Sequence, residues 1–372
     1  MNRLVRTTVV LVVVAIGACG KGAPHVGAEE GLGVQRWSWH APPPASVGMP
    51  AADGAGSVAT RSHTVVLAFA PDGHIRWQTS RLGVREETPA LTPDLAIVPA
   101  DDGIVAFDRN TGRVRWDTAL GGNVMTPEPE EAVSTPVLAP RTVLACVSGG
   151  GLVALDLNTG AVRWRQQLAG RSDGPPATDG RTVVASWDPE QGNDAGIVAF
   201  DVVTGEQRWA ERLDAGGVSA PAIAGHSQAM AVVVDHDLAA KAFDLSTGNQ
   251  LWKAAVGGAG SPDVPPLAVA ADRVLVADRL AGLTLFDNRG RRLWSTRTDG
   301  AAVRGGPAGP DAGGRYVMPL YDGTVLVAGP GHRARTVDAP GGLANGVAVT
   351  PDGDVLVSTA QGEDNQLVAY RP

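Results

Sequence analysis

The stretch that decides the fold reads ALDLNTGAVRW, from Ala154 to Trp164, because the chain returns to it several times. Alternating apolar residues before the Asp predict one strand, Asp-x-x-Thr-Gly predicts a tight turn, and the Trp lies on the next strand. In that turn the carboxylate caps backbone N–H groups and Gly takes a positive φ that other residues adopt only at a cost. The unit is therefore an antiparallel hairpin. Close and looser copies occupy residues 106–116, 199–209, 242–252, 69–77 and 285–294.

The spacing of the tryptophans predicts the architecture. Successive copies are separated by 39 residues (Trp77 to Trp116) to 48 residues (Trp116 to Trp164). Repeats of roughly 40–45 residues with several short strands are typical of β-propeller blades, which have about four strands each. No stretch shows sustained apolar recurrence at helical spacing, so we expect an all-β, eight-bladed propeller. Its outer strands are predicted at Trp37, Trp77, Trp116, Trp164, Trp209, Trp252, Trp294 and Arg335.

The two ends of the repeat region complement each other. Residues 33–39 match a Trp-bearing strand that lacks the strand and turn before it, and residues 366–371 match the strand before the turn with no Trp strand after it. Pairing the two closes the ring and removes an open sheet edge. We therefore predict one propeller domain over residues 33–372, with the N-terminal strand as the outer strand of the last blade.

The first residues have the layout of a lipoprotein signal peptide. A basic start precedes an apolar run that is too short to span a membrane stably. Residues 16–19, Ile-Gly-Ala-Cys, resemble a bacterial lipobox, which predicts a signal peptide over 1–18 and lipid, such as palmitate, on Cys19. The alternative is an ordinary signal peptide cut nearby. Residues 19–32 are small, polar and Gly-rich, which predicts a flexible tether. We expect an exported chain that faces the periplasm or exterior and is held to the cell membrane or outer membrane by lipid alone.

The repeated tryptophans and turn glycines are predicted to be structural. Each Trp has the same position in its blade, so each meets the neighbouring blade in the same way and buries a large apolar surface. A platform for stacking ligands is the alternative. Cys146, in an apolar strand, is expected to be an inert core thiol. The turn glycines of the close copies are Gly112, Gly160, Gly205 and Gly248.

The sequence contains no recognisable catalytic constellation. The turn aspartates belong to separate tight turns, and Asp-x-x-Thr-Gly lacks the ligand spacing of an EF-hand loop. The seven histidines show no metal-binding spacing, and residues 235–237, Asp-His-Asp, are interpreted as a solvated strand end. A formal net charge of −8 with no basic run argues against a nucleic-acid partner.

The topology of a blade indicates where binding would occur. With strands numbered from the axis outward, the 2–3 and 4–1 connections emerge on one face, which we call the loop face. The 1–2 and 3–4 turns emerge on the other, the turn face. The longer and more acidic segments belong to the loop face, which we expect to bind a protein partner; the alternative is that they are solvated insertions. The expected partner-binding residues are Glu128, Glu130, Glu131, Asp188 and Glu190.

The pattern Ala-x-Asp-x-x-Thr-Gly-x-x-x-Trp, with Pro at the start of the inner strands, resembles the pyrroloquinoline-quinone-type (PQQ-like) propeller repeat over residues 33–372. With the lipobox, the chain resembles the BamB-like propeller lipoproteins of outer-membrane β-barrel assembly. That resemblance implies a non-catalytic scaffold of the cell envelope, a monomeric propeller within a complex, that binds protein partners.

Quinoprotein alcohol dehydrogenases share this repeat and supply the enzyme alternative, beside a small-ligand sensor. They typically carry a disulfide between adjacent cysteines and a calcium held by Glu and Asn near a catalytic Asp. This chain has no adjacent cysteines. We therefore expect no enzyme activity, no metal and no quinone cofactor.

Overall fold

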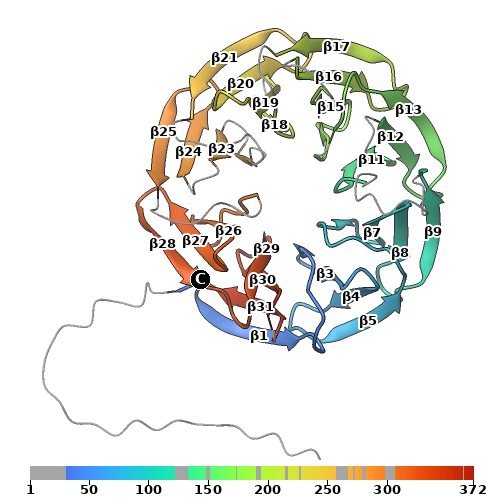
Figure 1. The fold of residues 1–372 in the computed structure, drawn as a ribbon, viewed down its shortest axis with the longest axis vertical. Helices are drawn as coiled ribbons and strands as arrows, with labels where there is room; N and C mark the ends of the chain where they lie inside the picture. The colour runs from blue at the N-terminus through green and yellow to red at the C-terminus, as the bar shows by residue number, and fades with distance from the viewer. Residues whose placement is uncertain are drawn as a thin grey trace, which may run out of the picture. The chain divides into compact units, whose positions relative to one another are not determined.

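A computed structural model shows an all-β protein. Its folded unit extends from Leu32 to Pro372. Every element assigned in the described residues is a strand, and the strands form eight antiparallel sheets, or blades, arranged in a ring (Figure 1). The predicted eight-bladed propeller is confirmed. The structure describes residues 31–121, 133–147, 151–172, 174–189, 194–213, 217–225, 228–256, 267–270, 273–278, 282–297, 306–362 and 364–372.

The first four blades each have four strands, which follow one another from the axis outward. Blade 1 contains β2 (Ala51–Asp53), β3 (Gly56–Arg61), β4 (Val65–Phe69) and β5 (Ile75–Ser80). Blade 2 contains β6 (Ala90–Leu91), β7 (Leu95–Ala100), β8 (Gly103–Asp108) and β9 (Val114–Ala119). Blade 3 contains β10 (Val137–Ala139), β11 (Thr142–Val147), β12 (Gly151–Asp156) and β13 (Val162–Gln167). Blade 4 contains β14 (Ala177–Thr178), β15 (Thr182–Trp187), β16 (Gly196–Asp201) and β17 (Gln207–Arg212).

The other four blades complete the ring. Blade 5 contains β18 (Ala222–Ala224), β19 (Met230–Val234), β20 (Ala239–Asp244) and β21 (Gln250–Ala255). Blade 6 contains β22 (Leu267–Ala270), β23 (Arg273–Ala277), β24 (Gly282–Asp287) and β25 (Arg292–Arg297). Blade 7 contains β26 (Tyr316–Pro319), β27 (Thr324–Gly329) and β28 (His332–Asp338). Blade 8 contains β29 (Leu343–Val349), β30 (Val355–Ala360), β31 (Gln366–Arg371) and β1 (Val34–His40).

Blade 7 is the one blade with three assigned strands among the described residues. The inner position, where residues 306–308 predict a fourth strand, has only an isolated bridge between Ala308 and Val317. Pro307 and Pro310 flank this bridge, and proline has no N–H to donate to a ladder. Pairing at the axis is therefore limited to Ala308, and the outer strand β28 carries Arg335 in place of a Trp, as predicted.

The ring closes as predicted, through its two ends. β1 pairs antiparallel with β31, with Val34 opposite Arg371 and Trp39 opposite Leu367. One acid joins the two terminal strands. Asp354, in the β29–β30 turn, accepts hydrogen bonds from Arg371 at 2.9 Å and Arg36 at 2.6 Å. Burial raises the pKa of Asp354, but these two arginines outweigh it and hold the pKa below its usual value.

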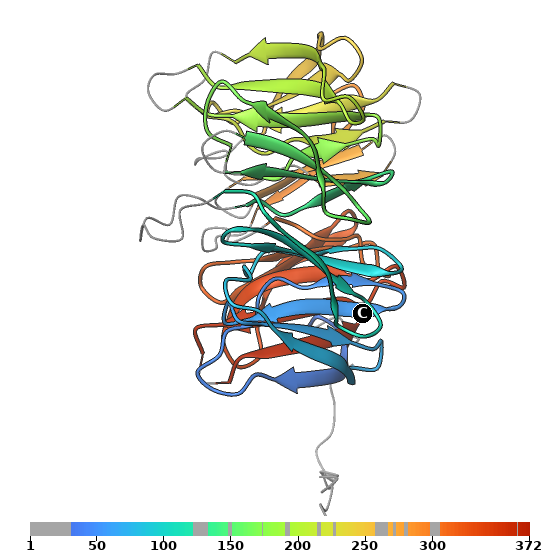
Figure 2. The ribbon, with the colours of Figure 1, turned by 90° about the vertical axis from the view of Figure 1, so that its right-hand side faces the viewer.

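The hydrophobic core lies between adjacent blades. The strand before each turn is buried along almost its whole length, whereas the outer strand alternates between exposed and inward-facing residues, with the Trp facing inward. Each apolar cluster spans two blades: Leu144 of blade 3, for example, packs in one cluster with Phe200 of blade 4. The sheets therefore pack face to face around the ring (Figure 2). Leu32 is buried between blades 7 and 8.

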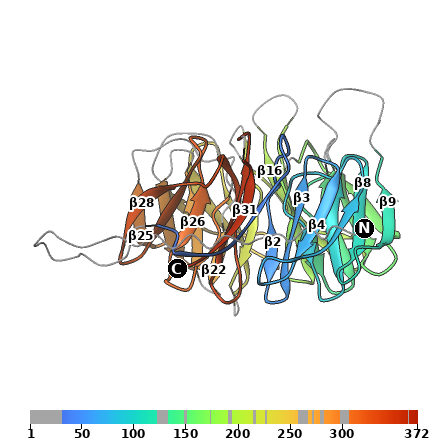
Figure 3. The same ribbon diagram turned by 90° about the horizontal axis from the view of Figure 1, so that it is seen from below.

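The connections separate onto two faces, as the strand numbering requires. Seen from the side, the hairpin turns emerge at both ends of the strands (Figure 3). Within the described part of the chain, no helix is long and apolar enough to cross a membrane.

Candidate functional site

Each repeated Trp but the last docks on the turn of the following blade. In these six pairs the indole N–H donates to a backbone carbonyl two residues or fewer after the end of the preceding strand. The turn Gly lies directly against the indole ring, and a Cβ added to Gly160 would lie 2.6 Å from Trp116. Trp294 packs against the apolar cluster between blades 6 and 7. The donor and acceptor pairs are Trp37–Pro71, Trp77–Arg109, Trp116–Leu157, Trp164–Val202, Trp209–Leu245 and Trp252–Asn288, at 2.7 to 3.1 Å.

The turn aspartates are occupied within their own turns. Asp156 Oδ1 accepts from the backbone N–H groups of Asn158 and Thr159 at 3.0 and 3.1 Å, and Oδ2 accepts from Arg163 at 2.5 Å. Arg163 and these turn donors lower the pKa of Asp156 from 3.8 to about 2. The carboxylates therefore fix the turns. The glycines that follow, Gly112, Gly160, Gly205 and Gly248, have φ of 69°, 72°, 73° and 78°.

An exposed apolar side chain on the loop face lies within a charged network between blades 1 and 2. Leu82, in the 4–1 connection after β5, is 77% exposed, while Val84 in the same segment is fully buried. Before it, Arg81 donates to Asp102 at 2.8 Å and to Asp117 at 3.2 Å. The arginine is held by acids of blade 2, so the segment around Leu82 has a defined position.

A second group of ion pairs continues this network. Arg85 donates to Glu87 at 2.7 Å and lies 3.5 Å from Asp101. Glu86 accepts a hydrogen bond from the hydroxyl of Ser46 and lies 3.9 Å from Nε2 of His63. The loop face between blades 1 and 2 is therefore rich in charge, with most acids partnered by cations.

The turn that carries His63 is strained. Ser62 and His63 both have positive φ, 46° and 54°, in the tight turn between β3 and β4. Such turns favour Asn-Gly because other residues adopt this conformation at a cost. The surrounding hydrogen bonds, including Val84 N–H to His63 O at 3.1 Å, hold the turn.

Of the expected partner-binding residues, only Asp188 is described. Its Oδ1 accepts from the backbone N–H of Val218 at 2.9 Å, and its backbone pairs with Arg171. Asp188 therefore connects blade 4 to the 4–1 connection that leads into blade 5. Glu128, Glu130, Glu131 and Glu190 lie outside the described residues, as does Cys19.

The interpretation of residues 235–237 as a solvated strand end is wrong for Asp235. Asp235 is fully buried and its carboxylate lies 2.7 Å from Nζ of the buried Lys241. Asp278 has the equivalent place in blade 6, where it is 3% exposed and accepts from Arg297 at 2.7 Å. The repeated position, one residue after the second strand, is a signal that sequence reasoning missed; Asp188 occupies it in blade 4.

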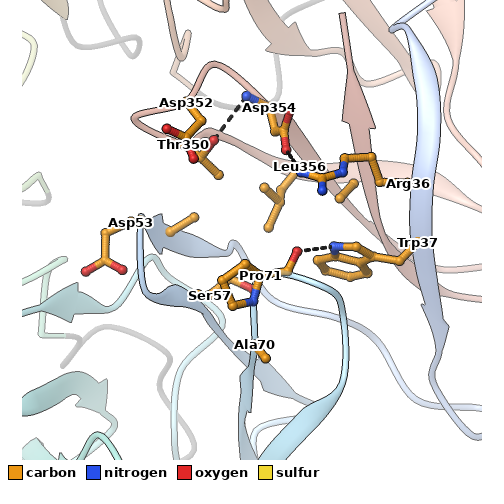
Figure 4. A pocket seen from close by; sticks show the side chains of 14 residues that line it. Arg36, Trp37, Asp53, Ser57, Ala70, Pro71, Thr350, Asp352, Asp354 and Leu356 are labelled. Atoms are coloured by element: carbon orange, nitrogen blue, oxygen red, sulfur yellow. Dashed lines mark hydrogen bonds and ion pairs between the residues drawn. The ribbon is translucent and has the colours of Figure 1, made fainter.

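The structure has a small cavity on the turn face, where blade 8 meets blade 1 (Figure 4). It lies between the β29–β30 turn, with Thr350 and Asp354, and the β4–β5 turn, with Pro71. Its volume is about 40 Å³, which is enough to hold ordered water. The buried hydroxyl of Ser57 borders the cavity and has no protein partner. The cavity therefore has the size and polarity of a water site.

The described residues offer no obvious place for a metal. No group of three or more His, Cys, Asp or Glu among them could hold one. Cys146 is 1% exposed and packs in the apolar cluster between blades 3 and 4, which is the core position that its strand predicts.

The repeated blades agree with the protein family that the sequence matches. A family model described as outer membrane protein assembly factor BamB matches residues 26–174, 163–259 and 235–342. The chain belongs to the BamB family. Among curated proteins, no sequence matches it.

Several solved structures share the fold of this chain. BamB from Moraxella catarrhalis is 20% identical, with a TM-score of 0.65 over 91% of this chain and 97% of that one. A europium-containing methanol dehydrogenase is 16% identical, with a TM-score of 0.67 over 89% and 85% of the two chains. The computationally designed protein Ika8 is 15% identical, with a TM-score of 0.67 over 87% and 96%. At these identities the similarity shows the fold alone.

Proposed function

We propose that this BamB-family protein is a non-catalytic, lipid-anchored scaffold outside the cytoplasm, which binds a protein partner of outer-membrane assembly through its loop face. Membership of the family supports the role. The anchor rests on the lipobox that ends at Cys19.

One observation carries the position of the contact. Leu82 is 77% exposed, yet the segment that bears it is fixed by Arg81 and by the buried Val84. An apolar side chain on a fixed backbone segment leaves only its own rotamers to be ordered on binding, and polar groups around it exclude water once the partner is in place. We therefore assign Leu82 as the centre of the contact on the loop face, with the neighbouring ion pairs as its rim.

The test places a photo-reactive amino acid at position 82 of the full chain in living cells of a host with an outer membrane. We expect a crosslink to a component of the outer-membrane barrel-assembly machinery. Position 203 is a matched control, because Val203 is also an exposed apolar residue, at 70%, but lies on the turn face of blade 4. Equal products from both positions, or none from position 82, would refute this assignment.

A second candidate function, that of a quinoprotein, follows from the similarity to the methanol dehydrogenase. The methanol dehydrogenase shares the fold of this chain. Titration with pyrroloquinoline quinone, followed by absorbance, separates the two functions. Stoichiometric binding of the quinone, together with dye-linked alcohol oxidation, would refute the scaffold function and indicate an enzyme.

A further inference from the structure

The turn face of blades 6 to 8 carries a group of exposed arginines, which we call the arginine patch. The outer strands β25, β28 and β1 follow one another along the rim, and the C-terminus lies beside them (Figure 1). All six side chains come from the ends of strands or turns on the turn face. The patch consists of Arg289, Arg291 and Arg292 of blade 6, Arg333 of blade 7, and Arg36 and Arg371 of blade 8.

The acids near the patch leave it positively charged. Asp287 is 6% exposed and is bound to Arg291 at 2.7 Å, and Asp354 holds both arginines of blade 8. Asp352 is an exposed acid of the same sector. Six arginines against three aspartates and the C-terminal carboxylate leave a charge of +2 (6 − 4) in a chain of net charge −8. Within the described residues, three patch arginines have no acid partner: Arg289, Arg292 and Arg333.

The chain enters the folded unit beside this patch. Leu32 is buried in the junction of blades 7 and 8, and Gly33 lies against the backbone of Arg371, where a Cβ would be 2.1 Å from the carbonyl oxygen. β1 then leads from the turn face, at Val34, to the loop face, at His40. The residues before Leu32, which include the expected lipid-bearing Cys19, therefore join the propeller at its turn face and next to the arginines.

We propose that the arginine patch binds the phosphate groups of anionic lipids in the membrane to which the chain is attached. Guanidinium groups bind phosphate oxygens through paired hydrogen bonds, and clustered arginines near an anionic surface add to each other's attraction. The acidic loop face is repelled by the same surface. The orientation follows: the turn face rests on the membrane, and the loop face with Leu82 is directed away from it toward a partner.

This inference rests on the proposed lipid anchoring, but its test does not require a lipid attached to the protein. Residues 20–372, which contain the complete folded unit but neither the expected signal peptide nor Cys19, are mixed with phosphatidylcholine vesicles that contain or lack phosphatidylglycerol, and bound protein is measured by co-sedimentation. We expect binding only to the anionic vesicles, and a loss of binding as salt rises.

The patch variant is Arg289→Gln/Arg292→Gln/Arg333→Gln in the same chain. A single arginine near an anionic surface changes affinity by about fivefold, so losing three is expected to weaken binding about 100-fold. The control variant is Arg165→Gln/Arg212→Gln/Lys253→Gln, which removes the same charge from exposed positions on the outer strands of blades 3, 4 and 5, in the half of each strand that is nearer the loop face. It is expected to retain most of the binding. Thermal unfolding of both variants confirms that each is folded.

The outcomes separate this inference from the proposed function. Equal losses in the two variants, or binding that does not depend on phosphatidylglycerol, would overturn the arginine patch. A chain that binds anionic vesicles through the patch but gives no crosslink from position 82 would retain this inference and refute the partner assignment. A crosslink from position 82 in a chain that does not bind anionic vesicles through the patch would support the partner assignment and refute the arginine patch.

Discussion

The contact between Trp164 and Gly205 gives the most direct test of how the ring is held together. Trp164 donates to the carbonyl of Val202 at 3.0 Å and packs on Phe200, with ring centroids 6.4 Å apart. Gly205 has a φ of 73°, and a Cβ there would lie 2.8 Å from the indole ring. The two residues come from neighbouring blades, so the contact measures packing between blades and not within one.

The magnitudes follow from this geometry. A fully buried aromatic side chain removes about 150–250 Å² from water, worth roughly 4–6 kcal/mol as an upper estimate. Trp164 is only partly buried, so Trp164→Ala is expected to cost about 3–4 kcal/mol, including the hydrogen bond to Val202. Gly205→Ala costs about 1–2 kcal/mol for the left-handed backbone and about 1–3 kcal/mol for the clash. Removing the ring removes the clash, so the double variant costs about 1–3 kcal/mol less than the sum.

The assay is urea unfolding followed by far-ultraviolet circular dichroism, with all variants in a double-mutant cycle. Gly331→Ala is the control, because Gly331 has a φ of 80° but no atom within 4 Å of an added Cβ. It is expected to lose only the backbone term, about 1–2 kcal/mol. Equal costs for Gly331→Ala and Gly205→Ala, or additivity of the Trp164 and Gly205 substitutions within about 0.5 kcal/mol, would refute docking between blades.

Three further perturbations test the charged groups. Asp156 has a folded-state pKa of about 2, below its usual 3.8, so its stabilising effect is present above pH 3.8 and is lost as pH falls toward 2; Asp156→Asn should flatten the acid dependence of the unfolding midpoint in this range. Asp354→Asn releases two half-exposed arginines at ring closure and should cost about 1–2 kcal/mol in urea unfolding, whereas an unchanged midpoint would remove its closing role. Lys241→Met leaves the buried Asp235 unpaired and should cost about 3–5 kcal/mol in the same assay, with recovery when Asp235→Asn is added; no recovery would argue against the ion pair.

The fold could be predicted because its determinants are local and repeated. The turn Asp, the turn Gly and the Trp lie within eleven residues of each other, and each copy makes the same contacts, as Asp156 and Trp164 show. Ring closure could also be predicted, because the missing halves at the two ends are visible in the sequence. The three-stranded blade 7 could not, since the prolines around Ala308 match those that begin the other inner strands.

The candidate sites were harder to predict because their partners are distant in sequence. Arg81 bonds Asp117 from the next blade, and Asp188 bonds the backbone of Val218. A sequence shows the acids on the loop face but not which of them a neighbouring blade neutralises. The prediction of a solvated Asp235 is wrong for a related reason: its partner Lys241 lies in the next strand, and only the sheet register brings the two together.

The charge distribution gives the two faces different uses. A net charge of −8 repels an anionic surface, so a tethered propeller with evenly spread charge would stay away from it. In this chain three arginines of the patch, Arg289, Arg292 and Arg333, have no acid partner among the described residues and lie on the turn face, while acids such as Asp101 and Asp102 lie on the loop face. The rigid ring fixes the distance between these faces, and β1 runs from one to the other. With the proposed arginine patch on the membrane, the rigid ring directs Leu82 away from the membrane, which is what a scaffold needs in order to present a binding face to a partner.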